Sequence, residues 1–283
     1  MNIQWYPGHM TKAKREMIES LKLVNIVIEL LDARIPKSSR NPDIDSICIN
    51  KPRIVVLNKA DLANSNINNL WVKYFSSIGL SCIEVDSISG KGMKNIASII
   101  QDKFKDKNEA LKLKGIISKP VRVLICGIPN VGKSSLINKL AGRASTKTGD
   151  KPGVTKGKQW IRINSNMELL DMPGILWPKF EDLEVGLNLA YTGAIKDEIM
   201  DTVELAIKLI DKLRIMAPEN LFERYKVKNK DADSSDMLNE IAKSRGCILS
   251  GGVINVERMS IIMLDEFRGG KVGKISLEKP QNF

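Results

Sequence analysis

The sequence contains few cysteines and almost no histidine. Its four cysteines lie far apart without a C-x-x-C pair, and His9 is the only histidine among 283 residues. Because zinc sites and disulfide frameworks need closely patterned Cys and His residues, we expect neither. Unpaired cysteines are typical of a reducing compartment, so we predict a cytoplasmic protein.

Long apolar runs are lacking as well. The longest, residues 24–31, is interrupted by Asn25 and Glu29 and is too short to span a membrane. The first residues show no charged segment followed by an apolar one, so no signal peptide is expected. With 43% apolar and 27% charged residues, the composition is typical of a soluble globular protein without a membrane partner.

The positive charge is unevenly distributed along the chain. The formal net charge is +11, yet residues 193–283 hold 15 basic and 15 acidic residues, whereas residues 103–162 carry a local balance of +12. Such a concentration favours a polyanionic partner larger than a nucleotide. A solvated lysine-rich surface explains the charge equally well, and composition alone does not separate the two.

The stretch VRVLICGIPNVGKSS at residues 121–135 predicts a buried strand, a glycine-rich turn and the start of a helix. The turn matches G-x-x-x-x-G-K-[ST], in which the glycines let backbone N–H groups surround phosphate oxygens. Lys133 supplies a charge for the β and γ phosphates, and the Ser134 hydroxyl can ligate Mg²⁺. A chance strand–turn–helix is the alternative. We expect the nucleotide to contact Asn130, Val131, Gly132, Lys133, Ser134 and Ser135.

Predicted strands and helices alternate up to about residue 180, which is typical of a mainly parallel sheet with helical crossovers. Helical spacing prevails after that point and predicts a small all-helical domain. The lysine-rich residues 105–119 are weakly patterned, and we expect a connector there. The expected strands are 24–31, 53–57 and 81–85, with a hairpin of 160–163 and 167–170; the expected helices are 11–23 with Thr11 as N-cap, 66–78, 93–104, 198–216, 235–245 and 256–267.

A second motif, Asn58-Lys59-Ala60-Asp61, follows one of the predicted strands. The Asp61 carboxylate can accept hydrogen bonds from the ring N–H and the exocyclic amine of guanine, whereas adenine offers an acceptor at the first of these positions. Asn58 can bond the far edge of the ring, and the stem of Lys59 can lie over its face. Four residues often match by chance, so the motif needs support from its surroundings.

Three further elements supply that support. After the next strand, Ser87 and Ile88 can present a backbone N–H to the guanine carbonyl. Thr155 follows the phosphate loop in a polar segment, where its hydroxyl could complete the Mg²⁺ shell. Asp171 and Gly174 end a strand in the sequence DMPG, where the carboxylate can hold a metal-bound water and the glycine N–H can reach the γ-phosphate. Together these elements predict GTP as the nucleotide and Mg²⁺ as the cofactor.

These are the five signature elements of translation-factor-like GTPases, in the rotated order four, five, one, two, three. The chain therefore resembles the circularly permuted GTPases of ribosome assembly, specifically the bacterial ribosome biogenesis GTPase A group. The resemblance covers the full length and includes WYPGHM at residues 5–10, DARIP at 32–36 and FRGGKVGKISLE at 267–278.

The resemblance implies an α/β P-loop GTPase domain at residues 1–180, with permuted motif order, followed by a helical RNA-contacting domain at residues 181–283. It also implies GTP hydrolysis coupled to late maturation of the large ribosomal subunit. The partner would be the precursor of that subunit, and the protein would be a monomer away from the ribosome.

The catalytic group is the least determined part of the sequence. Ordinary GTPases orient the attacking water with a glutamine directly after Asp-x-x-Gly, but here that residue is Ile175. The family places the WYPGHM segment near the nucleotide, so His9 is our candidate for positioning or deprotonating the water, with Lys133 acting on the phosphates. A histidine that packs or caps is the alternative. Asn130 matches the residue that related GTPases use to hold K⁺, and a local loop hydrogen bond is its alternative.

Two other functions stay open at this point. The first is a GTPase in another RNA process, such as tRNA modification or translation control. The second is a nucleotide-gated RNA-binding module with negligible turnover, which Ile175 keeps open. The residues themselves indicate only a guanine nucleotide and a polyanion, since a fold does not imply a function.

Overall fold

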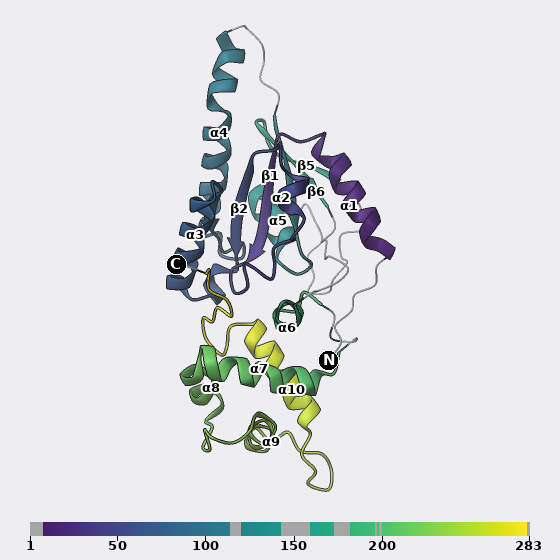
Figure 1. Ribbon diagram of the computed structural model, residues 1–283, viewed down its shortest axis with the longest axis vertical. Helices are drawn as coiled ribbons and strands as arrows, with labels where there is room; N and C mark the ends of the chain where they lie inside the picture. The colour runs from purple at the N-terminus through teal and green to yellow at the C-terminus, as the bar shows by residue number, and fades with distance from the viewer. Residues whose placement is uncertain are drawn as a thin grey trace.

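The described chain consists of a six-stranded sheet with its covering helices, and of a further group of helices beyond the ends of the strands (Figure 1). The computed structural model describes residues 8–113, 120–142, 159–172, 182–195, 197 and 200–281. In chain order the elements are α1 (Gly8–Leu21), β1 (Ile26–Asp32), α2 (Ile44–Ile47), β2 (Arg53–Asn58), η1 (Ala60–Leu62), α3 (Ser65–Ser77), β3 (Ser81–Glu84), α4 (Met93–Leu113), β4 (Val121–Gly127), α5 (Lys133–Ala141), β5 (Gln159–Asn164), β6 (Met167–Asp171), α6 (Leu183–Tyr191), α7 (Thr202–Met216), α8 (Pro218–Tyr225), α9 (Ser234–Ser244) and α10 (Val256–Arg268).

The sheet has the strand order β3-β2-β1-β4-β6-β5, and all neighbours are parallel except the hairpin of β5 and β6. The predicted hairpin and the mainly parallel sheet are therefore confirmed. The central strand β1 is buried along its whole length. Its nearly unbroken apolar sequence follows from this position, because helices cover both faces of a central parallel strand.

Alternate residues of the central strands face opposite layers of helices. Ile28 and its neighbours pack with Ile96 of α4 and Leu136 of α5 on one face. On the other face the strands pack with Met17 of α1 and Trp71 of α3. This two-sided cover is the doubly wound arrangement expected from alternating strands and helices.

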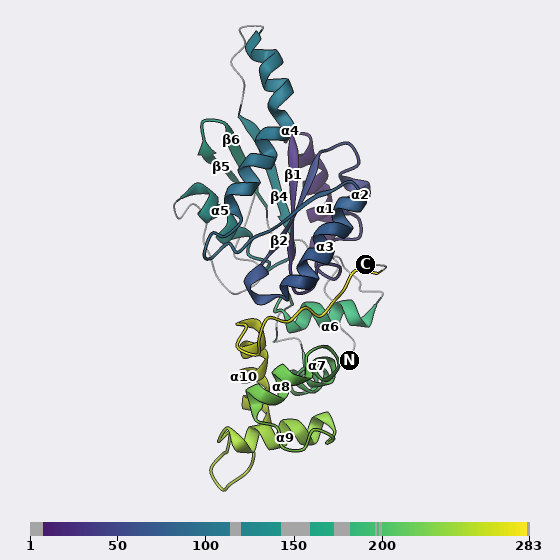
Figure 2. The ribbon, with the colours of Figure 1, turned by 90° about the vertical axis from the view of Figure 1, so that its left-hand side faces the viewer.

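The helices α6 to α10 lie beyond the carboxyl ends of the parallel strands (Figures 1 and 2). Three of them begin at aspartate N-caps whose side chains accept backbone N–H groups, namely Asp182, Asp201 and Asp233. Their buried apolar side chains join those of the sheet in one continuous cluster. Among the described residues no helix is long and apolar enough to cross a membrane.

The chain after α10 leaves the helices and returns to the sheet, where it runs toward α3 (Figure 2). The Ile275 N–H donates to the carbonyl of Leu62 at 3.0 Å, and the Leu277 N–H donates to the carbonyl of Arg34 at 2.8 Å. The half-buried Glu278 accepts hydrogen bonds from the N–H groups of Lys37 and Ser38 through its carboxylate. We call residues 271–281 the tail, and it binds the first half of the chain.

Three element predictions were wrong in their limits. Helix α1 begins at Gly8, so Thr11 lies inside the helix and cannot be its N-cap. Helix α4 continues to Leu113 through most of the expected connector, because Lys, Glu, Ala and Leu are good helix formers even without strong patterning. Helix α7 begins only after its aspartate cap at residue 201, later than the predicted start at 198.

Candidate functional site

The motif residues meet at the edge of the sheet where the parallel strands end. β1 ends at Asp32, β2 at Asn58, β4 at Gly127 and β6 at Asp171. The carboxyl edge of an open α/β sheet is where such folds bind ligands. The rotated motif order therefore still produces one site, because parallel strands bring their ends together whatever their order in the chain.

The phosphate loop joins β4 to α5 through Gly132, the N-cap of α5, which has a φ of 95°. A Cβ at this position would lie 2.3 Å from Nδ2 of Asn58, so only glycine fits. Val131 is buried beneath the loop, while Ser134 and Ser135 lie in the first turn of the helix. Backbone N–H groups at such a helix start form an anion site.

Lys133 is almost completely buried at the base of this loop. Its ammonium lies 3.3 Å from the carbonyl oxygens of Gly127 and Ile128. Burial lowers the pKa of Lys133 to about 8, against an opposing effect from Asp171. A phosphate in the loop would favour the charged form, so this lysine is suited to bind one.

Asp171 is fully buried and incompletely paired. Its Oδ2 accepts a long hydrogen bond of 3.4 Å from Nε2 of Gln159, and no donor from the described part of the chain reaches Oδ1. Burial raises the pKa of Asp171, although Lys133 and Gln159 lower it in part. A buried carboxylate oxygen without a partner is costly unless a cation or a bound water meets it. This atom fits a metal-bound water beside the phosphate loop.

Asn58 connects the phosphate loop to the loop after β3. Its Nδ2 donates to the carbonyl of Val131 at 2.7 Å, and its Oδ1 accepts the N–H of Ser87 at 3.2 Å. The side chain is fully buried. Its structural partners are thus main-chain groups of two loops, and its predicted contact with the base stays a prediction.

The next three residues are the N-cap and the first two residues of η1. Lys59 has a left-handed φ of 58°, and Ala60 begins η1, which also contains Asp61. Asp61 is exposed as a residue. The pKa of its carboxyl group is nevertheless raised, first by partial desolvation and then by the negative charge of Asp86. Two donors from a guanine edge would relieve that unfavourable charge, as the sequence predicts.

The loop after β3 already uses the N–H groups that were predicted to meet the base. The Ser87 N–H donates to Asn58, and the Ile88 N–H donates to Oδ1 of Asp86 at 2.8 Å. Lys139 of α5 donates to the carbonyl of Ile88 at 3.0 Å and ties this loop to the phosphate-binding helix. A base carbonyl would therefore have to share one of these donors.

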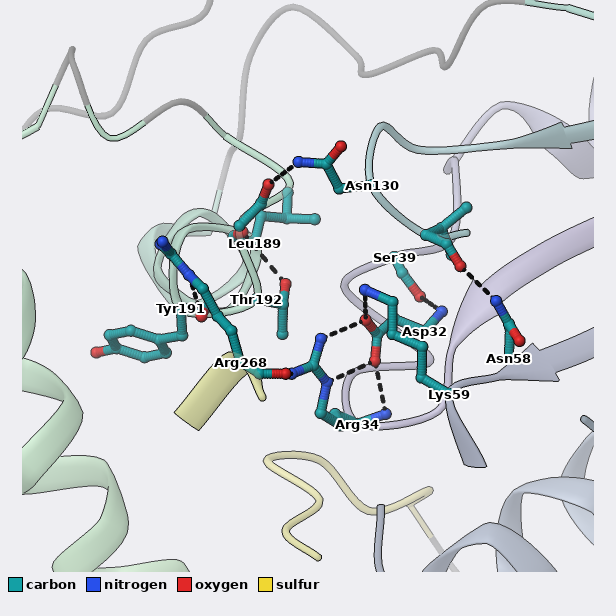
Figure 3. Close-up of polar contacts among 12 residues, drawn as sticks. Asp32, Arg34, Ser39, Asn58, Lys59, Asn130, Leu189, Tyr191, Thr192 and Arg268 are labelled. Carbon is teal, nitrogen blue, oxygen red and sulfur yellow. Dashed lines mark hydrogen bonds and ion pairs between the residues drawn. The ribbon is translucent and has the colours of Figure 1, made fainter. Parts of the chain in front are cut away.

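Asn130, the candidate potassium ligand, contacts the helical part of the chain. Its backbone has a left-handed φ of 56°, and its Nδ2 donates to the carbonyl of Gly193 at 2.7 Å (Figure 3). Gly193 lies in the turn after α6. This bond links the phosphate loop to the helical part of the chain, and the predicted potassium contact stays a prediction.

Three predicted site residues lack a description. Thr155 and Gly174 lie outside the described residues. The backbone of His9 lies in the first turn of α1, but its side chain is not described.

Sequence reasoning missed the role of Asp32 and Arg34. Arg34 is fully buried and donates to both carboxylate oxygens of Asp32, at 2.9 and 2.7 Å (Figure 3). Oδ2 of Asp32 also lies 3.2 Å from Nζ of Lys59, so it touches the base motif directly. The available signal was the DARIP segment, which places charged residues directly after an apolar strand.

Comparison with known proteins gives consistent relationships along the chain. A family model described as 50S ribosome-binding GTPase matches residues 122–250, which begin at the phosphate-loop strand and leave Asn58 and Asp61 before them. Ribosome biogenesis GTPase A of Bacillus cereus is 50% identical over 283 residues, covering all of this chain and 96% of that protein. The protein of that name from Thermotoga maritima is 32% identical over 281 residues, covering 99% and 95%.

Two solved structures are similar over nearly the whole chain. A GDP-bound structure of TM YlqF has a TM-score of 0.69 and 26% identity, covering 95% of this chain and all of that one. A crystal structure of GNP-bound YlqF from T. maritima has a TM-score of 0.67 and 28% identity, covering 96% of this chain and all of that one.

Proposed function

The chain belongs to the ribosome biogenesis GTPase A family, and from this membership we propose that it hydrolyses GTP to time a late step in maturation of the large ribosomal subunit. GTPase activity in ribosome biogenesis follows from the family; the subunit and the step are the proposal. The 50S ribosome-binding description of the matching family model supports the large subunit. A role in tRNA modification or translation control is not favoured, because relatives named for ribosome biogenesis match the whole chain.

One observation carries the nucleotide chemistry. The buried amide of Asn58 bonds Val131 of the phosphate loop and Ser87 of the loop after β3, and so holds these two loops in one arrangement. A nucleotide with its guanine against Asp61 would have its phosphates toward Gly132 and Lys133. Binding loops that are already in place lower the entropy cost of binding. That related structures hold GDP and GNP supports a guanine nucleotide here.

Mg²⁺ fits the residues beside the phosphate loop. Ser134 would ligate it directly, Asp171 would hold one of its waters through Oδ1, and Thr155 would complete the shell. The described residues contain no cluster of three or more acidic, His or Cys side chains for a metal, which agrees with Mg²⁺ bound mainly by phosphates and water. When bound, Mg²⁺ neutralises negative charge that develops on the phosphate oxygens.

We further propose a K⁺ ion held by Oδ1 of Asn130 and water attack assisted by His9. Asn130 has a left-handed backbone, and the hydrogen bond from its Nδ2 to the carbonyl of Gly193 fixes the orientation of the amide. Position 175, where other GTPases have the glutamine that orients water, is isoleucine. His9, the only histidine of the sequence, would take over this role.

We propose that residues 1–180 bind the nucleotide and residues 181–283 contact ribosomal RNA, in a protein that is monomeric off the ribosome. The basic excess of residues 103–162 supports contact of the nucleotide-binding part with an anionic particle as well, while the proposed contact of residues 181–283 rests on the family.

Phosphate release with and without purified large ribosomal subunits tests this function. We expect large subunits to stimulate turnover of the wild type. Lys133→Ala should weaken GTP binding and turnover together, because the buried ammonium meets the phosphates. His9→Ala should keep GTP affinity and lower stimulated turnover by something on the order of 10²-fold, the usual worth of a proton-transfer group.

Lys73→Ala serves as the control, because Lys73 is exposed on α3 and belongs neither to the site motifs nor to the proposed RNA-contacting residues 181–283. Stimulation by tRNA but not by large subunits would contradict the proposed partner. Unchanged stimulated turnover in the His9 variant would assign that residue to packing or capping.

A further inference from the structure

A buried ion cluster lies directly beside the proposed base site. Asp32 is 2% exposed and faces two cations, since Arg34 donates to both of its oxygens and Lys59 lies 3.2 Å from Oδ2. The N–H of Asp32 also donates to Oγ of Ser39 at 3.1 Å, which fixes the carboxylate from the opposite side. None of these contacts belongs to the phosphate loop or to the metal site.

This cluster determines where the Lys59 side chain lies. Lys59 is held at one end by its left-handed backbone and at the other by the Asp32 carboxylate. Its apolar stem must therefore run between two fixed points next to Asn58 and Asp61. A stem held in this way forms a ready-made surface for the face of a planar base.

Arg34 links the ion cluster at the end of β1 to helix α10. Its Nη1 donates to the main-chain carbonyl of Arg268 at 3.2 Å, and its guanidinium lies 5.7 Å from the centre of the Phe267 ring. Both partners belong to the last turn of α10. A single buried arginine thus joins the end of β1 to the end of a helix 234 residues later.

Arg268 passes the connection on to α6. Its guanidinium donates to the carbonyls of Ala190 at 2.9 Å and Tyr191 at 3.2 Å, the last residues of α6, and pairs with Asp197. A cation at the carboxyl end of a helix satisfies carbonyls that have no partner within the helix. A Cβ on Gly193 would lie only 3.3 Å from Nε of Arg268, so the turn after α6 fits closely against this side chain.

The turn after α6 closes a ring of contacts. The carbonyl of Gly193 accepts the hydrogen bond from Asn130 in the phosphate loop. The path therefore runs from Lys59 through Asp32, Arg34 and Arg268 to the turn, and then to Asn130. Figure 3 shows its members together, with the Asn58 bond that joins the same two loops on the other side.

We propose that Asp32, Arg34 and Arg268 are positioning residues that align the base-binding and phosphate-binding loops through the helical part of the chain. Guanine-nucleotide affinity then depends on how α6 and α10 sit against the sheet, and a partner that shifts these helices loosens the nucleotide. The inference rests on the proposed placement of guanine at residues 58–61.

Arg268→Met is the decisive variant. It removes the bonds to α6, while Arg34 keeps its partner because that partner is the main-chain carbonyl of residue 268. We expect the Kd for a fluorescent GDP analogue to rise by about 10-fold, within the range usual for coupling between sites. Arg224→Met is the matched control, since Arg224 pairs with Glu266 of the same α10 without contacting the nucleotide-binding half.

A double-mutant cycle separates positioning from general destabilisation. Lys59→Met already breaks the ring, so adding Arg268→Met to it should change the Kd far less than Arg268→Met alone. Melting temperatures are measured for every variant. Additive effects in the cycle, or a Kd for Arg268→Met equal to that of the control, would overturn the inference.

Asp61→Asn tests the base site independently. The amide should weaken GDP binding and favour a xanthine nucleotide, which carries an acceptor where guanine carries its amine. If Asp61→Asn behaves so and Arg268→Met matches the control, the proposed function stands and the inference fails. If Asp61→Asn leaves both affinities unchanged, the base site is wrong and the inference fails with it.

Discussion

The ionisation state of the buried Asp32 carboxylate is set by its two cationic neighbours. Burial alone would raise the pKa of Asp32, but the charges of Arg34 and Lys59 outweigh burial and hold the pKa well below its ordinary value of 3.8. The carboxylate is therefore charged in the folded protein at any ordinary pH. Such a group stabilises the protein only while its cations are present, because removing one partner leaves an uncompensated buried charge.

Replacing this carboxylate should change stability in a pH-dependent way. Because the folded-state pKa of Asp32 is lowered, its contribution is fully present above the unfolded pKa of about 4 and is lost as the pH falls below it. Asp32→Asn should thus lower the free energy of unfolding by about 3–5 kcal/mol at neutral pH. Urea unfolding of wild type and variant should show this difference narrowing from about pH 4 downward.

Asp102→Asn provides the comparison, since Asp102 is an exposed carboxylate on α4. A difference between wild type and Asp32→Asn that stays constant from neutral to acid pH would contradict the assigned ion cluster.

At single residues, the sequence predicts chemistry better than it predicts partners. Lys133 and Asp171 could be predicted as polar groups around a phosphate because their types and spacing follow a known pattern. The arginine at residue 34 could not, because its partner Arg268 is 234 residues away and is contacted through its main chain. A main-chain carbonyl has the same chemistry in every residue, so it leaves no mark in a sequence.

Among the elements, the tail behaves as a clamp rather than as part of a helical domain. Glu278 accepts from the N–H groups of Lys37 and Ser38 at 2.7 and 3.1 Å, and from Nδ2 of Asn188 at 3.0 Å. One carboxylate therefore joins the loop after β1 to α6. Trp71 of α3 adds a long hydrogen bond to the main-chain carbonyl of Glu278.

Removing this carboxylate should loosen both segments. Glu278→Ala should lower the free energy of unfolding by about 3 kcal/mol, the upper end of the cost of leaving buried donors unpaired. Urea denaturation measures the change, and Lys279→Ala, at an exposed neighbouring position, should stay within about 0.5 kcal/mol of wild type. Equal effects of the two substitutions would mean that the tail is held by its main chain alone.

Elements with their own periodicity were predictable, and elements fixed by tertiary contacts were not. The strands and α9 and α10 match their predicted positions within a few residues, because each carries a regular apolar pattern. Helices α6 and α8 span only nine and eight residues, and no helix was predicted at either position. The tail has no periodicity at all, since its backbone pairs with Leu62 and Arg34 instead of with itself.

At the scale of the whole molecule, the helical part meets the nucleotide-binding half at the carboxyl edge of the sheet. Asn130 reaches Gly193 there, so the phosphate loop directly contacts the turn after α6. We expect a change at the γ-phosphate to be transmitted across this contact. We expect GTP to set the helices in the orientation that fits the ribosomal particle.

Particle binding should report this coupling. Affinity for large-subunit precursors should be higher with a non-hydrolysable GTP analogue than with GDP, by about 1–3 kcal/mol. Sedimentation at one fixed salt concentration measures the difference, and equal affinities would rule out the coupling.

The affinity for the particle should also fall steeply with salt, because each neutralised phosphate releases counterions. Replacing four lysines of the basic stretch 103–162 by glutamine should flatten that dependence without changing GTP affinity; they are Lys147, Lys151, Lys156 and Lys158.

The contacts of the tail also constrain the order in which the parts of the protein can fold. The hydrogen bonds of Glu278 to Lys37 and to Trp71 join residues 241 and 207 positions apart, so these contacts form only after the tail has been synthesised. Domains fold from the N-terminus during synthesis, and contacts between distant residues form late. The sheet can thus assemble early, while the edge that holds Leu62 and Arg34 is completed only when Glu278 emerges. The finished binding edge therefore forms only after the tail has been synthesised and has docked on the sheet.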